Sequence, residues 1–155
     1  MGDPEMPVYI TTPQIFENLN IRYYNNTLSI DAGTDSCTIC VMSCDDNGAA
    51  IYDIREDVSQ ASFDDISENV SICVSKQGYA SHVSYLTFSY IQNQTFETPV
   101  IIESGVIRIG SSVTDSLQEG PVNFNGNIVE LKGRKIQIEP SVNVSNNTTL
   151  RISIK

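Results

Sequence analysis

The C-terminal part of the chain is a succession of short apolar bursts, and this feature most restricts the fold. From Val100 to Ile154 nearly every apolar residue belongs to such a burst, and Gly, Ser, Asn and Pro separate the bursts. Few helical patterns occur, and apolar positions recur at period two, which indicates short β-strands. We therefore predict an all-β fold. The bursts are Val100–Ile102, Val106–Ile109, Val122–Phe124, Ile128–Leu131, Ile136–Ile138, Val142–Val144 and Leu150–Ile154.

The starts of these bursts are regularly spaced. Steps of 22 residues separate positions 100 and 122, 106 and 128, and 128 and 150, and a step of 20 separates 122 and 142. This spacing predicts a short β-helix, or solenoid-like region, over residues 96–155, with three sides and about 20 to 22 residues per turn. A two-sided coil of about 14 residues per turn is the alternative. We expect positive φ angles at the glycines of the corners, Gly105, Gly110, Gly120, Gly126 and Gly133.

Residues 14–95 show a different pattern, in which turn signals interrupt short alternating segments. Seven such strands within one segment predict an immunoglobulin-like β-sandwich. The Asp45-Asp46-Asn47-Gly48 segment predicts a hairpin turn, with a calcium loop as the less favoured alternative. The predicted strands are Ile15–Asn20, Asn26–Asp31, Cys37–Cys44, Ala50–Arg55, Ala61–Asp64, Asn69–Lys76 and His82–Tyr90.

Residues 1–13 contain Pro4, Pro7 and Pro13, so we expect an extended linker there. The chain carries 19 acidic and 9 basic residues, a net charge of -10. An acidic chain without basic patches argues against nucleic acid and against anionic membrane surfaces as partners. No apolar stretch approaches the length of a membrane helix, so no membrane span is predicted.

Three cysteines, Cys37, Cys40 and Cys44, are closely spaced and resemble one half of a zinc site. Only Cys73 and His82 remain to complete such a site, and structural zinc sites usually pair two cysteine knuckles. We therefore predict no metal and no cofactor, and we interpret the cysteines as mostly free thiols. In a strand, Cys37 would share a face with Ile39 and Val41, while Cys40 and Cys44 would share the other face with Met42.

No residue of the chain is predicted to be catalytic. A dyad of Cys73 and His82 is geometrically possible on neighbouring strands, but no glycine-rich turn accompanies the two residues. The aromatic residues are the better candidates for a ligand surface, because tyrosine rings offer flat apolar faces with a polar tip. We expect glycans as possible ligands of Tyr23, Tyr24, Tyr52 and Tyr79.

Several segments together resemble one protein family. Residues 2–9, GDPEMPVY, are followed by Thr12-Pro13, then by CVMS at 40–43, DNG at 46–48 and NVSICVSKQGY at 69–79. In this order the segments resemble the immunoglobulin-like domain that follows the catalytic domain of gingipain-type cysteine peptidases of Bacteroidetes. Residues 91–95, IQNQT, resemble the junction into a C-terminal β tail of Bacteroidetes surface proteins.

The resemblance implies a non-catalytic accessory module of a secreted or surface peptidase, which supports or spaces the catalytic domain and mediates protein contacts. It implies an extracellular or outer-surface location, with an upstream catalytic domain or other surface proteins as partners. The alternative is a free-standing adhesin or carbohydrate-binding module. The family's catalytic His and Cys would precede Met1, so neither is carried over. We expect the interdomain contact at Pro4, Met6, Pro7, Val8 and Tyr9.

Overall fold

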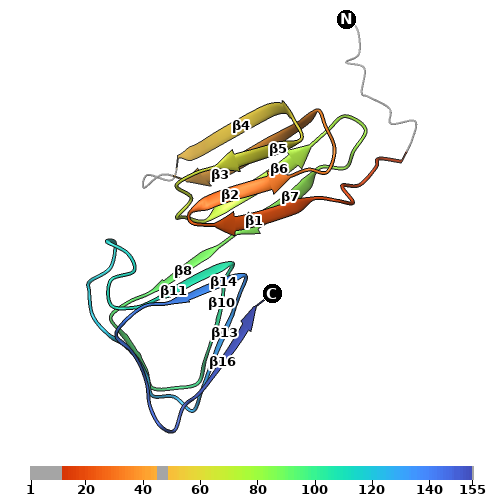
Figure 1. Cartoon of the computed structure of the whole chain (residues 1–155). Helices are drawn as coiled ribbons and strands as arrows, with labels where there is room; N and C mark the ends of the chain where they lie inside the picture. Colours follow the sequence, from red (N-terminus) through yellow and green to blue (C-terminus); the bar gives the residue numbers. More distant parts are fainter. Residues whose placement is uncertain (1–11, 45–48, 155) are drawn as a thin grey trace, which may run out of the picture. The chain divides into compact units, whose positions relative to one another are not determined.

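The computed structural model describes residues 12–44 and 49–154, which form sixteen strands and no helix. The expectation of an all-β protein is therefore confirmed. In these ranges there is accordingly no helix that is long and apolar enough to span a membrane. The chain divides into two compact units (Figure 1). The first unit comprises the described residues up to Ile66 together with Val70–Ser84, and the second comprises Ser67–Asn69 and the residues from Tyr85 on.

The first unit contains two sheets whose recorded pairings are antiparallel. One sheet has the order β1-β2-β5, and the other has the order β4-β3-β6-β7. Strand β7 extends past Ser84, the last residue of the unit. The strands are β1 (Asn20–Tyr24), β2 (Thr27–Asp31), β3 (Cys37–Cys44), β4 (Ala50–Val58), β5 (Gln60–Phe63), β6 (Val70–Ser75) and β7 (His82–Leu86).

The core of this unit follows from the alternation of its strands. Ile39 of β3 and Ile72 of β6 are fully buried, and so is Leu28 of β2, because alternate side chains of a strand point to the same face. The predicted faces of β3 are confirmed. Cys37 and Ile39 are buried on one face with Val41, whereas Met42 and Cys44 are exposed on the other.

Two predicted strands differ from the structure by more than their ends. The predicted strand Ile15–Asn20 is wrong, because residues 15–19 form no strand. The first strand, β1 (Asn20–Tyr24), was not predicted and shares only Asn20 with that segment. The predicted strand His82–Tyr90 is interrupted at Thr87, because this residue bonds to a corner of the second unit. Its carbonyl accepts from the Val106 amide at 2.8 Å, and its Oγ1 accepts from the Gly105 amide at 2.9 Å.

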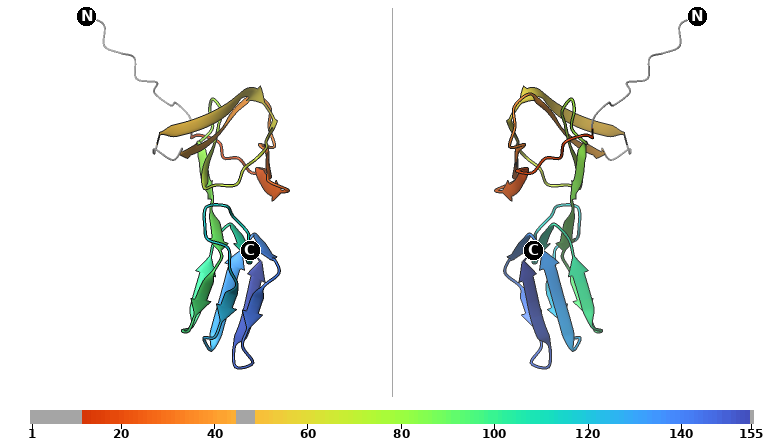
Figure 2. Two further views of the ribbon diagram at one scale, coloured as in Figure 1. Left: turned by 90° about the vertical axis from the view of Figure 1, so that its left-hand side faces the viewer. Right: turned by 90° about the vertical axis from the view of Figure 1, so that its right-hand side faces the viewer.

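The second unit consists of nine strands in three parallel sheets, in the orders β8-β11-β14, β9-β12-β15 and β10-β13-β16. Successive strands therefore visit the three sheets in turn, and Figures 1 and 2 show the resulting three-sided stack. The strands are β8 (Phe88–Ile91), β9 (Gln94–Phe96), β10 (Val100–Glu103), β11 (Val106–Ile109), β12 (Val122–Phe124), β13 (Ile128–Gly133), β14 (Lys135–Ile138), β15 (Val142–Val144) and β16 (Thr149–Ile154).

Side chains of equivalent positions form rows across the turns of this stack. The middle residue of each inward-facing row is fully buried, because a turn covers it on both sides. These rows hold the core of the second unit. The inward-facing rows are Ser89–Ile107–Ile136, Ile91–Ile109–Ile138, Gln94–Val122–Val142, Phe96–Phe124–Val144, Val100–Val129–Leu150 and Ile102–Leu131–Ile152.

The predicted spacing holds for the last turn and fails for the one before it. Val122 pairs with Val142, and Val129 pairs with Leu150, close to the predicted steps. Val100 pairs with Val129 instead of the predicted Val122, however, because the chain between β11 and β12 leaves the stack as a loop. Strand β8 and the first two residues of β9 fall within the segment 14–95 that was expected to form the sandwich, yet these strands pair with β11 and β12.

Gln92 holds this loop from inside the second unit. Its side chain is 2% exposed. Its Oε1 accepts from the Val113 amide at 2.6 Å and from the Thr114 amide at 3.1 Å. Its Nε2 donates to the carbonyls of Thr114 at 3.2 Å and Leu117 at 2.8 Å. One buried amide thus satisfies four backbone groups of an otherwise irregular segment.

The expectation of positive φ angles at the corner glycines is wrong. Among the described glycines only Gly33 and Gly78 have positive φ, and both lie in the first unit. Glycine is needed at these corners for a different reason, because the backbone of another segment lies close to several of them. A Cβ at Gly126, for example, would lie 2.2 Å from the carbonyl oxygen of Thr98.

Candidate functional site

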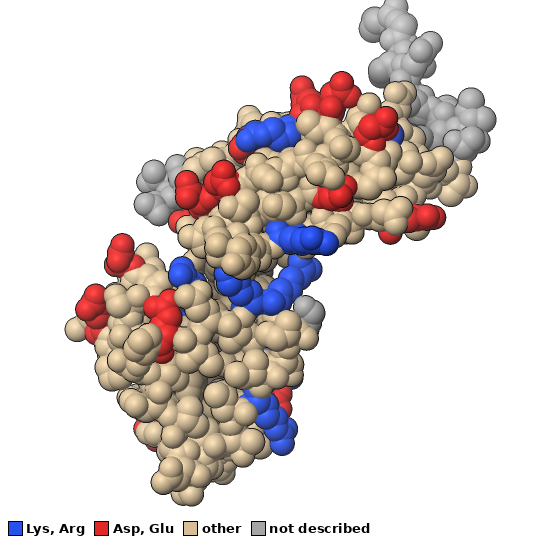
Figure 3. All heavy atoms as spheres, in the orientation of Figure 1, with Lys and Arg blue, Asp and Glu red and all other residues tan. Residues whose placement is uncertain are grey.

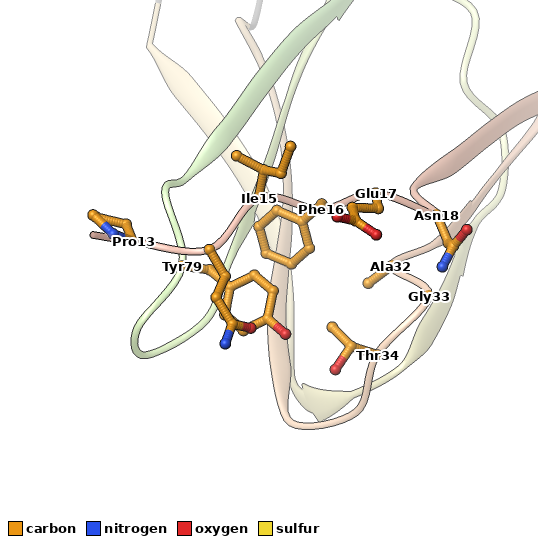
Figure 4. Close-up of a pocket in the computed structure, with 10 residues that line it drawn as sticks. Pro13, Ile15, Phe16, Glu17, Asn18, Ala32, Gly33, Thr34 and Tyr79 are labelled. Carbon is orange, nitrogen blue, oxygen red and sulfur yellow. The ribbon is translucent and has the colours of Figure 1, made fainter. Parts of the chain in front are cut away.

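The first unit contains a cavity of about 410 Å³. Its walls come from the segment before β1, the turn between β2 and β3, and the turn after β6. Figure 4 shows the rings of Phe16 and Tyr79 side by side, with Asn18 and Thr34 across the opening from Pro13. The lining residues are Pro13, Gln14, Ile15, Phe16, Glu17, Asn18, Ala32, Gly33, Thr34 and Tyr79.

Backbone hydrogen bonds attach the segment before β1 to the turn after β6. The Gln14 amide donates to the Gly78 carbonyl at 2.9 Å, and the Gln14 carbonyl accepts from the Ala80 amide at 2.9 Å. These two bonds bracket Tyr79, which forms an isolated parallel bridge with Gln14. Gly78 has φ +81°, a conformation that glycine adopts without steric cost. The cavity wall is thereby tied to the sheet through β6.

Gly33 allows the opposite wall to come close. Its φ is +68°, and its amide donates to Oδ1 of Asp31 at 2.9 Å, closing a local turn. A Cβ at this position would lie 2.6 Å from the Cβ of Asn18. Only glycine therefore combines the required backbone conformation with the approach of residue 18.

The aromatic wall of the cavity consists of Phe16 and Tyr79. Their ring centroids are 5.0 Å apart and their planes are inclined by 34°, an ordinary geometry for an aromatic pair. Lys76 Nζ lies 5.3 Å from the centroid of the Tyr79 ring. A cation at this distance is attracted to the ring face and helps to fix the orientation of Tyr79.

Lys76 also joins the turn between β2 and β3. Its Nζ donates to Thr34 Oγ1 at 2.7 Å, to the Asp35 carbonyl at 2.9 Å and to Asp35 Oδ1 at 3.0 Å. The hydrogen bond from Lys76 holds the pKa of the Asp35 carboxyl below its ordinary value, and the same bond raises the pKa of Lys76. Both groups therefore stay charged at neutral pH, and Lys76 holds the cavity residue Thr34 in place.

Cys37 and Cys40 show no feature of an activated nucleophile. Cys37 is buried, and its Sγ donates to the carbonyls of Thr34 and Asp35, each at 3.4 Å. Burial raises the pKa of the Cys37 thiol. Cys40 of β3 lies directly opposite Cys73 of β6, and burial, followed by the charge of Cys73, raises the pKa of the Cys40 thiol. Such thiols stay protonated at neutral pH, whereas a reactive cysteine needs its thiolate.

His82 begins β7, the neighbour of β6, which carries Cys73. Across residues 12–44 and 49–154, no three His, Cys, Asp or Glu side chains gather in a way that could hold a metal ion.

The structure places the four predicted ligand-surface tyrosines on three different elements. Tyr23 and Tyr24 are consecutive in β1 and so point to opposite faces, and Tyr52 lies on β4 of the other sheet. Tyr23 Oη donates to the Ile66 carbonyl at 2.8 Å. Tyr79 alone lines the cavity. The residues predicted for the interdomain contact, Pro4, Met6, Pro7, Val8 and Tyr9, and the predicted hairpin turn at 45–48 lie outside the described residues.

Sequence reasoning did not identify Phe16, Asn18 and Thr34 as cavity residues. The turn between β2 and β3 supplies Gly33 and Thr34. The contact of Phe16 with Tyr79 joins residues that are far apart in the chain. A contact of this kind follows from the tertiary fold, and no local sequence pattern predicts it.

The second unit has a cavity of its own, of about 590 Å³. Phe88 and Tyr90 line it, with centroids 6.2 Å apart and nearly parallel planes. Arg108 also lines it. Arg108 Nη2 lies 3.8 Å from Glu139 Oε1, and its buried Nε has no hydrogen-bond partner. Because Glu68 and Asp115 lie in the same lining, both signs of charge meet here.

The cavity of the first unit is suited to a small neutral ligand with several hydroxyl groups. Rings at one wall can stack on an apolar face, while amide, carboxylate and hydroxyl groups of Gln14, Glu17, Asn18 and Thr34 can exchange hydrogen bonds. Figure 3 shows that most of the surface on this face of the molecule is uncharged. No protein-family model, curated protein or solved structure matches the chain.

Proposed function

We propose that the chain is a non-catalytic accessory module of a secreted or surface gingipain-like cysteine peptidase. It supports or spaces the catalytic domain and mediates contacts with other surface proteins. The observation that carries this proposal is a sandwich-like unit followed by a parallel stack, in the order that the sequence resemblance implies. This role requires no catalytic residues in either unit, because both units act through rigid surfaces.

The first unit is best interpreted as an immunoglobulin-like sandwich. Its seven strands divide three and four between two sheets, and the buried faces of β2, β3 and β6 supply a common apolar core. The fourth strand pairs with β3 and not with β5, so the division differs from that of antibody constant domains.

The second unit is best interpreted as a short three-sided β-helix. Three parallel sheets of three strands, visited in turn, and six inward rows of side chains support this interpretation. A stack of this kind is stiff, because each turn bonds to its neighbours along every side. Stiffness is the property that a spacer between a catalytic domain and a cell surface requires.

The native gene product tests the accessory function. We expect intact-mass measurement and peptide mapping in the cells of origin to find a protein much heavier than 17.1 kDa, on the outer surface or in the medium. The additional peptides should include a caspase-like domain with a catalytic His and Cys. A product of this chain with only a signal peptide before it would contradict the proposal.

A second function, binding of a neutral glycan, is favoured by the cavity of Phe16 and Tyr79. A sugar ring could stack on the Tyr79 face, whose orientation Phe16 and Lys76 help to fix. The ligand's hydroxyls would then meet the polar groups of Asn18 and Thr34. This function is compatible with an accessory role and also with a free-standing adhesin.

Glycan-array screening, followed by calorimetry with any neutral oligosaccharide that binds, tests this second function. Tyr79→Ala should weaken binding about tenfold, since a ring contact contributes roughly 0.5–1.5 kcal/mol. Tyr52→Ala is the matched control, because Tyr52 is 65% exposed on β4 and does not line the cavity. Loss of binding on Tyr90→Ala alone would assign the ligand to the cavity of the second unit, and silence on the array would reject the function.

A further inference from the structure

Two cysteines of the first unit lie directly opposite each other on neighbouring strands. Cys40 of β3 and Cys73 of β6 are register partners in an antiparallel pair. In such a pair the Cα atoms of opposite residues are about 4.5 or 5.5 Å apart, depending on whether the two residues exchange hydrogen bonds. Both values fall within the range of about 4.4–6.8 Å that a disulfide bridges. The backbone therefore already has the spacing that a bond between these residues requires.

The side chains of both cysteines point away from the core. Ile39 and Val41, the neighbours of Cys40 in β3, are buried, and so is Ile72 beside Cys73. Because side chains alternate along a strand, both cysteines lie on the opposite, outer face of the sheet. Each of them is half-buried. A small reagent in solution can therefore reach the pair from one side of the sheet.

The electrostatics of the pair also indicate that the two sulfur atoms are close. Burial, and after it the charge of Cys73, raises the pKa of the Cys40 thiol. A neighbouring negative charge has this effect only over a short distance. Proximity in space thus agrees with the register of the strands.

The other two cysteines have no cysteine opposite them, and all four lie within the residues that the structure describes. Cys37 is buried on the inner face, where its Sγ donates to two backbone carbonyls. Cys44 shares the outer face with Cys40, but it lies four residues further along β3, roughly 13 Å away, and its partner is Ala50. The geometry therefore selects one pair.

We propose that Cys40 and Cys73 are the site of a reversible cross-strand disulfide, formed by exchange with a low-molecular-weight disulfide such as oxidised glutathione. The thiolate of one cysteine attacks a sulfur of the small disulfide, whose S–S bond breaks and releases one small thiol. The thiolate of the other cysteine then attacks the protein sulfur of the mixed disulfide and releases the second small thiol. Two protein thiols are oxidised, one small disulfide is reduced, and the two protons pass to the small thiols.

The bond ties together the two central strands of the four-stranded sheet. In the order β4-β3-β6-β7, the strands β3 and β6 are neighbours and both edge strands lie outside them. The structure shows the reduced form, in which both thiols are free. Oxidation closes residues 40–73 into a loop that contains β4 and β5. Closure of a loop of this length restricts the unfolded chain and so favours the folded one.

Intact-mass measurement of the chain, after incubation with oxidised glutathione at about pH 8.5, tests this proposal; the basic pH supplies thiolate. We expect the mass to fall by two hydrogen atoms and the number of free thiols to fall from four to two. Trypsin with cyanogen bromide, which cleaves after Met42, separates Cys40 from Cys44. The digest without reduction should join residues 23–42 to residues 56–76.

Thermal unfolding of the oxidised chain provides the second measurement. Its midpoint should lie roughly 10 °C above that of the reduced chain, and an excess of dithiothreitol should reverse the shift. An oxidised chain that melts no higher than the reduced one would overturn the inferred tie between the strands.

Three serine variants assign the bond. Cys40→Ser and Cys73→Ser should each abolish the disulfide and the thermal shift. Cys44→Ser is the matched control, because Cys44 lies on the same strand and face as Cys40, and this variant should keep both. Circular dichroism checks that each variant folds, and Cys73→Ser decides if Cys40→Ser unfolds.

Four free thiols in the treated native chain would overturn the proposal. An intramolecular disulfide that persists in Cys40→Ser or Cys73→Ser, or one that is lost in Cys44→Ser, would overturn it as well, because the bond would then involve a different pair. None of these outcomes bears on the accessory function.

Discussion

At the scale of single residues, glycine determines how closely two segments of the first unit can approach. Gly33 and Gly78 both have positive φ, at +68° and +81°. They differ in their surroundings, because a Cβ at Gly33 would meet Asn18, whereas a Cβ at Gly78 would meet nothing within 4 Å. The pair therefore separates the cost of backbone conformation from the cost of a steric clash.

Gly33→Ala should lower the free energy of unfolding more than Gly78→Ala does. We expect a loss of about 1 kcal/mol at Gly78, from the positive φ alone, and roughly 2–4 kcal/mol at Gly33, where the clash is added. Urea denaturation of the two variants measures both values. Equal losses would mean that Asn18 moves away freely, and the cavity wall would then be more adaptable than its hydrogen bonds imply.

The ion pair of Lys76 and Asp35 should make stability depend on pH in a defined direction. The lowered pKa of Asp35 means that its contribution is present above the ordinary value of 3.8 and is lost as the pH falls through the folded-state pKa. The raised pKa of Lys76 means that its contribution is present below 10.5 and is lost as the pH rises through the folded-state pKa.

Asp35→Asn should therefore be less stable than the native chain between these limits and should approach its stability in acid. Unfolding by urea at a series of pH values measures the difference. In a Lys76→Gln background the same substitution should show no such pH dependence. A constant difference at every pH would show that the carboxylate charge is unimportant.

Part of the site is predictable at this scale, and part is not. Tyr79 was identified from its residue type, because that signal is local. The approach of Phe16 to Tyr79 and of Asn18 to Gly33 depends on how the segment before β1 crosses the unit. That path leaves no periodic pattern, and the apolar residues of 15–20 were consequently interpreted as a strand.

At the scale of elements, strands with one buried face were predictable to within a few residues. β3 agrees with the predicted Cys37–Cys44, and β6 agrees with Asn69–Lys76 to one residue at each end. The pairing of turns in the second unit was less predictable. Val113 has the appearance of a strand residue and is 7% exposed, but it belongs to the loop that Gln92 holds. Because this loop lies between β11 and β12, Val100 pairs with Val129 and not with the predicted Val122.

The two faces of β12 should respond very differently to truncation. Phe124 is fully buried, with its ring centroid 5.2 Å from that of Phe96. Phe124→Ala should cost about 3–5 kcal/mol, since it leaves a cavity in the middle of an inward row. Asn123→Ala, on the outer face of the same strand, removes hydrogen bonds to solvent-exposed partners and should cost less than about 1 kcal/mol.

Urea denaturation of the two β12 variants provides this comparison. Similar losses for both would contradict the inward orientation of Phe124 and with it the assignment of the row Phe96–Phe124–Val144 to the core.

At the scale of the whole molecule, the two units have separate cores. The core of the first unit is formed by residues such as Leu28, Ile39 and Ile72, and that of the second by the inward rows. Units with their own cores can open independently. Phe124→Ala should therefore increase amide hydrogen exchange in the strands from β8 to β16 and leave β2, β3 and β6 unchanged. Uniform acceleration throughout the chain would show a single cooperative unit.

In the parallel stack of the second unit, the length of the stack does not depend on how many residues each turn contains. Each turn adds one strand to every side and so advances the stack by about 4.8 Å, whatever number of residues the turn contains. The turn from Val100 to Val129 includes the loop between β11 and β12 and takes 29 residues. The next turn, from Val129 to Leu150, takes 21 residues and advances the stack by the same distance. Loops can thus lengthen sideways and acquire new surfaces while the reach of the module stays constant, and its reach changes only in whole turns.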